Sequence, residues 1–238
     1  MTSKYNKHPF PVEGWAREEQ FRFFKTFTQP FFNVHTQVDI TPLYHRCKQQ
    51  NHSVFLGYLY ATLEAARATE SFRLRLEGEA VVLYEGVDLS TTVLRHDHSI
   101  SFVSLPHQPS LAEFCAHSRD LISAAQAGKQ LFVGHQGPDL LHLTTLPWFK
   151  STGIEHAYSV NPQEAGVPKI AFGQLEVQPG KVILPLSIAL HHALADGYHV
   201  HLFLQQMQRV IQDLAEEFSN EMPVQEEPVL PVFSENRL

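Results

Sequence analysis

The sequence predicts an α/β fold, a two-layer sandwich in which helices pack against a mixed β-sheet. Short runs rich in β-branched and aromatic residues alternate with longer segments whose apolar residues recur at helical spacing. Helices are expected before, between and after the strands, and no internal repeat is present. At 238 residues the chain is long enough to bury a sizeable core without disulfides or metals. A single domain is therefore expected.

Two helices are predicted early in the chain. Thr41 is a suitable N-cap, and Pro42 a suitable first residue, for a short helix that ends near Gln50. Apolar residues at helical spacing predict a second, well buried helix over residues 54–68.

Two further helices are predicted later. Ser110 with Glu113 three residues on indicates a capping box at the start of a helix over 110–127. Residues 198–218 carry apolar side chains on one helical face and predict the last helix.

Strands fill most of the remaining chain. The first two form a hairpin around Glu77-Gly78-Glu79, because this turn separates two short apolar runs. The predicted strands are 72–76, 80–84, 87–94, 99–105, 140–145, 158–160, 169–177 and 181–190.

The last twenty residues differ in composition from the rest. Residues 219–238 are acidic and contain several prolines, so they are expected to form a mobile or surface-draped tail after a domain at 1–218. Packing of the tail's apolar residues at an interface is the alternative.

Charge and cysteine usage exclude several classes of partner. The net charge is −7, and no helix carries a cluster of basic residues, which argues against a nucleic-acid or anionic-membrane partner. Cys47 and Cys115 are far apart and are expected to be free thiols in a reducing compartment. The N-terminus leads into no apolar signal core, and no apolar run reaches membrane-spanning length. A cytoplasmic location is the expectation.

The most informative segment is His191-His192-Ala193-Leu194-Ala195-Asp196-Gly197, which lies between a predicted strand and the last helix. A neutral imidazole at the end of a buried strand is a natural general base near neutral pH. The alternative for His192 is a satisfied core histidine. His191 is expected on the opposite face of the strand, with a packing role.

The 15 histidines raise the alternative of a metal site. The candidate groups are His96, Asp97 and His98 with His107, and His191 and His192 with His199. Neither spacing fits a known zinc pattern, so no metal is expected.

The strand-HHxxxDG-helix arrangement resembles the active-site segment of the chloramphenicol acetyltransferase family, within the wider group of CoA-dependent acyltransferases. Four further segments resemble the family in the right order: Trp15-Ala16-Arg17-Glu18-Glu19-Gln20-Phe21, Val38-Asp39-Ile40-Thr41, Phe72-Arg73-Leu74-Arg75 and Leu146-Pro147-Trp148.

The resemblance implies an O-acetyltransferase that uses acetyl-CoA as co-substrate. The acetyl group would pass directly, without an acyl-enzyme, to a hydroxyl of a small amphipathic acceptor such as chloramphenicol, an activity that implies antibiotic resistance. The resemblance also implies a homotrimer with active sites between subunits. An acyltransferase for a different acceptor, or a non-catalytic ligand-binding trimer, are the alternatives.

The resemblance assigns roles to individual residues. His192 matches the catalytic base, and Asp196 matches a carboxylate that pairs with Arg17 and holds the active-site turn. Thr144 stands where the family has a serine oxyanion donor, and its ordinary alternative is a plain strand threonine. Ala171 replaces a threonine near the transition state.

The acceptor pocket of the family is an apolar, aromatic-lined slot. The matching positions here are Phe23, Phe24, Pro30 and Phe32, with simple core packing as the alternative for each phenylalanine.

Overall fold

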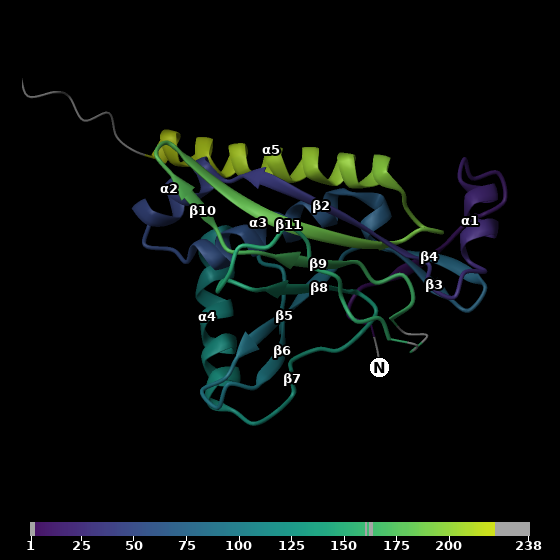
Figure 1. The fold of residues 1–238 in the computed structure, drawn as a ribbon, viewed down its shortest axis with the longest axis horizontal. Helices are drawn as coiled ribbons and strands as arrows, with labels where there is room; N and C mark the ends of the chain where they lie inside the picture. Colours follow the sequence, from purple (N-terminus) through teal and green to yellow (C-terminus); the bar gives the residue numbers. More distant parts are fainter. Residues whose placement is uncertain (1–2, 160, 162–163, 222–238) are drawn as a thin grey trace, which may run out of the picture.

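The computed structural model describes residues 3–159, 161 and 164–221. A large mixed sheet is covered by helices on one face, and a small three-stranded sheet lies beside it (Figure 1). This arrangement confirms the predicted α/β fold with a mixed sheet.

The large sheet has eight strands, in which β9 and β10 pair with successive parts of one edge of β11 and β2 pairs with the other edge. Three pairs, β5 with β8, β8 with β9 and β6 with β7, are parallel, and the rest are antiparallel. The strands are β10 (Glu176–Gln178), β11 (Lys181–His191), β9 (Lys169–Phe172), β8 (Leu140–Thr145), β5 (Asp88–Leu94), β6 (Ile100–Leu105), β7 (Phe132–Val133) and β2 (Phe31–Asp39).

Four helices cover one face of this sheet, and α5 runs alongside β2 (Figure 1). They are α2 (Thr41–Gln49), α3 (Val54–Ala68), α4 (Leu111–Ala127) and α5 (Gly197–Glu221). Apolar side chains such as Leu141, Leu143 and Ile170 point from the sheet into this core. Because side chains alternate along a strand, the residues between them face the opposite side, away from the helices.

The small sheet packs against the N-terminal helix. Its strands, in the order β1 (Lys7–Phe10), β4 (Ala80–Tyr84) and β3 (Leu74–Glu77), adjoin α1 (Glu18–Phe24) through a second apolar cluster around Phe21. A short 3₁₀ helix, η1 (Glu70–Phe72), occupies the first position of the predicted hairpin.

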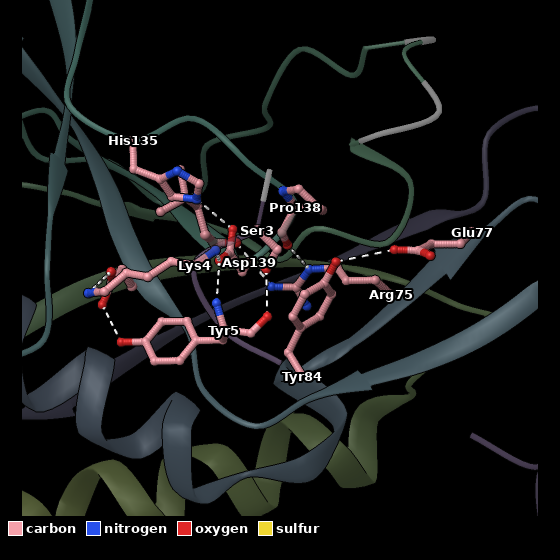
Figure 2. A network of polar contacts seen from close by, with 11 residues as sticks. Ser3, Lys4, Tyr5, Arg75, Glu77, Tyr84, His135, Pro138 and Asp139 are labelled. Carbon is pink, nitrogen blue, oxygen red and sulfur yellow. Dashed lines mark hydrogen bonds and ion pairs between the residues drawn. The ribbon is translucent and has the colours of Figure 1, made fainter. Parts of the chain in front are cut away.

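A buried polar network fixes the start of β8 (Figure 2). Arg75 is fully buried and donates to four carbonyl oxygens, those of Phe72, Leu74, Pro138 and Leu140, at 2.6–3.0 Å. Asp139, also fully buried, accepts from His135 at 2.7 Å and from the backbone N–H of Lys4 at 2.6 Å. The N-terminal segment and the hairpin thereby hold β8, which carries Thr144, in place.

The predicted strand over 169–177 is wrong in one respect: it is interrupted and forms β9 and β10. Phe172 pairs with Leu186, and Glu176 pairs with Ile183. Between these two pairs, the three residues 173–175 lie opposite the two residues 184–185. This is a β-bulge, and it lies opposite Pro185, which has no N–H to donate to the ladder.

Two smaller predictions are also wrong. The N-cap of α2 is Ile40, because the Thr41 hydroxyl instead donates to Asp39 Oδ1 at 2.5 Å and accepts from the Val182 N–H at 2.8 Å. Tyr158 and Ser159 are in no strand, and Val160 lies outside the described residues. The Tyr158 ring stacks on Phe31 of β2, and its hydroxyl donates to the Asn33 side chain.

The remaining differences concern the length of the last helix and the elements that were not predicted. The last helix continues to Glu221, past its predicted end, and the rest of the predicted tail lies outside the described residues. The predicted elements did not include α1, β1, β2 or β7.

Candidate active site

His192 directly follows β11, in the turn that leads to α5. Its backbone N–H donates to the Pro30 carbonyl at 2.8 Å, and its Nδ1 lies 3.1 Å from the Ala195 carbonyl oxygen. A carbonyl oxygen only accepts hydrogen bonds, so Nδ1 carries the proton and Nε2 keeps its lone pair. This is the tautomer that a general base needs.

Two aromatic rings hold the imidazole of His192. The Phe24 ring is stacked on it, with centroids 3.8 Å apart and an interplanar angle of 6°. The Phe32 ring lies 4.5 Å away at 39°. Phe23, by contrast, is 61% exposed and contacts Phe24 and Phe27. Three of the four predicted acceptor residues, Phe24, Pro30 and Phe32, are thus gathered at His192.

Arg17 and Asp196 form an ion pair beneath this turn. Arg17 Nη2 also donates to the His192 carbonyl at 2.8 Å, which ties the pair to the histidine backbone. Asp196 Oδ1 accepts from the Tyr198 N–H at 3.0 Å, so the carboxylate also caps the start of α5. Burial alone would raise the pKa of Asp196, but the hydrogen bond from His199 and the charge of Arg17 outweigh it and lower the pKa. The carboxylate is charged at neutral pH.

His191 is buried beside the turn. Its Nδ1 accepts from the Ala193 N–H at 3.2 Å, and its ring meets Phe31 edge-on. Burial, with a smaller contribution from His192, lowers the pKa of His191 to about 4. These contacts and the neutral state of the imidazole support a packing role for His191.

A cavity of about 1320 Å³ lies against the sheet and extends to the helices α3 and α4, whose Phe55, Tyr58, Ile122 and Gln126 also line it. Its sheet wall includes residues that alternate along β5, β8 and β9, namely Ser90, Thr92, Leu140, His142, Thr144 and Lys169, and also Val93, Leu94, Leu143 and Thr145. Thr144 lies beside Ala171 in the β8–β9 pair. The hydroxyl oxygen of Thr144 is 3.5 Å from the hydroxyl oxygen of Thr92.

The part of the cavity wall that β6 and β7 form is apolar and aromatic. Phe102 and Phe132 are stacked, with centroids 5.4 Å apart, and both line the cavity. Leu94, Ile100 and Trp148 add to this wall. Neither these residues nor Ser90, Thr92 and His142 were among the predicted site residues. For the last three, the alternation within 88–94 and 140–145 was a usable signal, because it separates a core face from a second face.

One end of the cavity is polar and was also missed. Lys169 Nζ donates to His142 Nδ1 at 3.2 Å and lies 3.4 Å from Glu164 Oε2. Burial and the charge of Lys169 lower the pKa of His142 to about 3 and that of His156 to about 4. Both imidazoles are neutral at pH 7. A single lysine within the apolar run 167–172 was the signal in the sequence.

Thr144 and His192 do not meet within one chain. Thr144 pairs with Ala171, which pairs with Ser187 on β11, and His192 is five residues further along the chain. At about 3.3 Å per residue this places the two more than ~16 Å apart along the strand direction. Of the predicted site residues, Thr144 lines the cavity, and His192, Phe23, Phe24, Pro30 and Phe32 do not.

Two searches of the described residues gave negative results. No group of three or more His, Cys, Asp or Glu side chains there could hold a metal ion. No helix in the same part of the chain is long and apolar enough to cross a membrane.

Comparison with solved structures identifies the fold. A chloramphenicol acetyltransferase structure superposes with a TM-score of 0.75 and 24% identity, over 87% of this chain and 100% of the other. A dihydrolipoamide acetyltransferase from Azotobacter vinelandii gives a TM-score of 0.62 and 20% identity, over 84% and 87%.

Sequence comparison gives the family. Residues 5–208 match the family model described as chloramphenicol acetyltransferase, and the chain is accordingly a CoA-dependent acyltransferase. It belongs to the chloramphenicol acetyltransferase family, as its motifs predicted. Chloramphenicol acetyltransferase 3 of Escherichia coli is 24% identical over 209 residues, covering 86% of this chain and 97% of that enzyme. The Bacillus pumilus chloramphenicol acetyltransferase is 26% identical over 203 residues, covering 84% and 91%.

Proposed function

We propose that this protein transfers an acetyl group from acetyl-CoA to a hydroxyl of a small amphipathic acceptor, with His192 as the general base. The hydrogen bond between His192 Nδ1 and the Ala195 carbonyl carries the proposal, because it leaves Nε2 free to accept a proton. The relatives named chloramphenicol acetyltransferase support acetyl transfer as the reaction.

The reaction needs two proton transfers and, at the carbonyl carbon, the exchange of a carbon–sulfur bond for a carbon–oxygen bond. His192 Nε2 takes the proton of the acceptor hydroxyl while that oxygen attacks the thioester carbonyl carbon of acetyl-CoA. The carbon–sulfur bond then breaks, the ester is released, and the CoA thiolate receives the proton from the imidazolium. The Thr144 hydroxyl donates to the oxyanion that forms between these steps. No acyl-enzyme is required.

The active site is proposed to lie between two copies of the chain in a homotrimer. The separation of His192 from the cavity that holds Thr144 supports this, because one chain alone cannot bring both to one substrate. Exposed aromatic side chains near both halves, Phe23, Phe27, Trp148 and Phe149, offer apolar surface for contact between copies.

Mixed trimers test this arrangement. A chain with His192→Ala and a chain with Thr144→Leu are each expected to be inactive alone, since each lacks one half of every site. When the two are co-expressed, random assembly should restore about a quarter of the sites. Mixed trimers that are shown to form and yet remain inactive would argue against a shared site.

The acceptor itself is tested by release of free thiol from acetyl-CoA. Chloramphenicol and a panel of other small hydroxyl compounds are the acceptors, and His192→Ala is the control. We expect acceptor-dependent thiol release by the native protein and none by the variant, with an unchanged melting temperature. An equal rate in both would contradict the role of His192, and no thiol release with any acceptor would favour a ligand-binding protein.

A further inference from the structure

We propose that the acceptor carries an anionic oxygen group, a carboxylate in the simplest case, which binds to Lys169 at the polar end of the cavity. The inference rests on the proposed function, since it takes the cavity with Thr144 as the acceptor site. It adds a specificity-determining residue and a class of acceptor.

Two parallel rows of side chains cross the sheet wall of the cavity. The row at Thr144 continues through Thr92 to the aromatic pair of Phe102 and Phe132. The next row, two residues away, is polar: Lys169 pairs in register with His142, and His142 with Ser90. The cavity therefore offers apolar surface beside Thr144, the proposed oxyanion donor, and a charged group one row further on.

Lys169 is placed as a ligand for a negative group. Its side chain is only 7% exposed, yet it reaches the cavity. An ammonium has three N–H donors, and two are directed at His142 and Glu164. The contact with Glu164 is 3.4 Å, longer than a charge-assisted hydrogen bond of about 2.7–2.9 Å, and that carboxylate is one-third exposed. A ligand carboxylate can therefore approach Lys169 more closely than its own counter-ion does.

Two buried nitrogen atoms in the cavity wall also lack a hydrogen-bond partner among the described residues. They are the Nε2 of His156 and the amide nitrogen of Gln136. Unpaired buried polar atoms are costly and are rare unless a ligand or water completes them. The Lys169 ammonium and the Gln136 amide nitrogen are donors, and the neutral His156 imidazole can donate when its proton is on Nε2, so these groups suit oxygen acceptors.

The register sets the length of the acceptor. His142, the partner of Lys169, is two residues from Thr144 on β8. The acceptor's hydroxyl, which reacts beside Thr144, and the acceptor's anionic group should therefore lie roughly 7 Å apart. A benzylic alcohol with a para carboxylate, 4-(hydroxymethyl)benzoate, spans about this distance and places its ring between the two rows. Its methyl ester is the matched neutral acceptor.

The test compares these two acceptors in the full-length protein. The native protein should show a kcat/KM for the acid that exceeds the value for the ester by about tenfold to a hundredfold, the range for a hydrogen-bonded charge. Lys169→Met should remove this preference, and Lys169→Arg should retain part of it. The exposed Lys181 provides the control, since Lys181→Met should leave the preference intact.

A binding measurement separates this inference from the catalytic one. In the His192→Ala background the acid should raise the melting temperature more than the ester does, and adding Lys169→Met should abolish the difference. If this pattern appears without any acetyl transfer, the anion site stands and the proposed reaction fails. If the acid is favoured in neither binding nor turnover, or if Lys169→Met leaves its advantage unchanged, the inference is overturned.

Discussion

The imidazole of His192 lies flat on the ring of Phe24, with the centroids 3.8 Å apart and the planes within 6° of each other. Together with the bond from Nδ1 to Ala195, this stack leaves the imidazole one orientation. The base is therefore held by contacts within its own chain before any substrate binds.

Phe24→Leu should lower kcat by roughly twofold to tenfold, because aromatic pairing of this kind is worth about 0.5–1.5 kcal/mol. The fold should be retained. Tyr44→Leu is the control, since it also replaces an aromatic ring by leucine but lies on α2, where its ring contacts His45. Steady-state kinetics on both variants check the expectation, and equal losses would show that the stack does not position the base.

Thr144→Val should lower kcat by about tenfold to a hundredfold, because it removes a hydroxyl that donates to the oxyanion but keeps the shape of the side chain. Thr144→Ser keeps the hydroxyl and should retain activity. KM should change little in either variant. A valine variant as active as the serine variant would remove Thr144 from the oxyanion site.

The ion pair of Arg17 and Asp196 should behave as one unit. Arg17→Met and Asp196→Asn should each reduce activity and stability, because each leaves the other without its counter-charge. The double variant should lose less than the sum, by about 1 kcal/mol or more. Chemical denaturation of the four proteins measures this coupling, and strictly additive losses would mean that the two side chains act independently.

Arg75→Met should destabilise the fold by about 3–5 kcal/mol, because four buried carbonyl oxygens lose their donor at once. Arg73→Met is the control, since the Arg73 side chain donates to the single carbonyl of Tyr84. Urea denaturation of both variants provides the comparison. A similar small loss in both would show that the Arg75 network contributes little to stability.

Stability should fall in mild acid because of buried histidines. The folded pKa of His191 and of His156 is about 4, and that of His142 is about 3, against about 6.5 in an unfolded chain. The unfolded state therefore binds more protons below pH 6.5. The stability present above that pH is lost as the pH falls toward 4.

His191→Asn should reduce this acid sensitivity between pH 7 and 5, since asparagine can accept the same hydrogen bond from Ala193 but does not titrate. His201→Asn, at an exposed position, is the control. Melting temperatures across the pH range decide the point, and parallel curves for the native protein and His191→Asn would refute it.

The sequence predicted the motif residues better than the cavity. Arg17, His192 and Asp196 could be identified because the turn HHxxxDG and the segment around Trp15 are short and contiguous. Lys169 and His142 are 27 positions apart, and only the parallel pairing of β8 with β9 brings them together. Alternation along each strand was visible, but strand order was not.

The bulge opposite Pro185 shows a second limit. Gly173 within the run 169–177 is a local signal for a bulge, but the position of the interruption opposite Pro185 depends on strand pairing that local sequence does not identify. The same holds for Phe102 and Phe132, whose contact requires β6 and β7 to be neighbours.

The alternation within β8 has an evolutionary consequence. Leu141 and Leu143 belong to the hydrophobic core, whereas His142, which lies between them on β8, belongs to the cavity wall and not to that core. Mutations at His142 can therefore change which acceptors bind without removing a side chain of the hydrophobic core. A combinatorial library confined to Ser90, Thr92, His142 and Lys169 should accordingly yield mostly folded proteins that differ in what they acetylate.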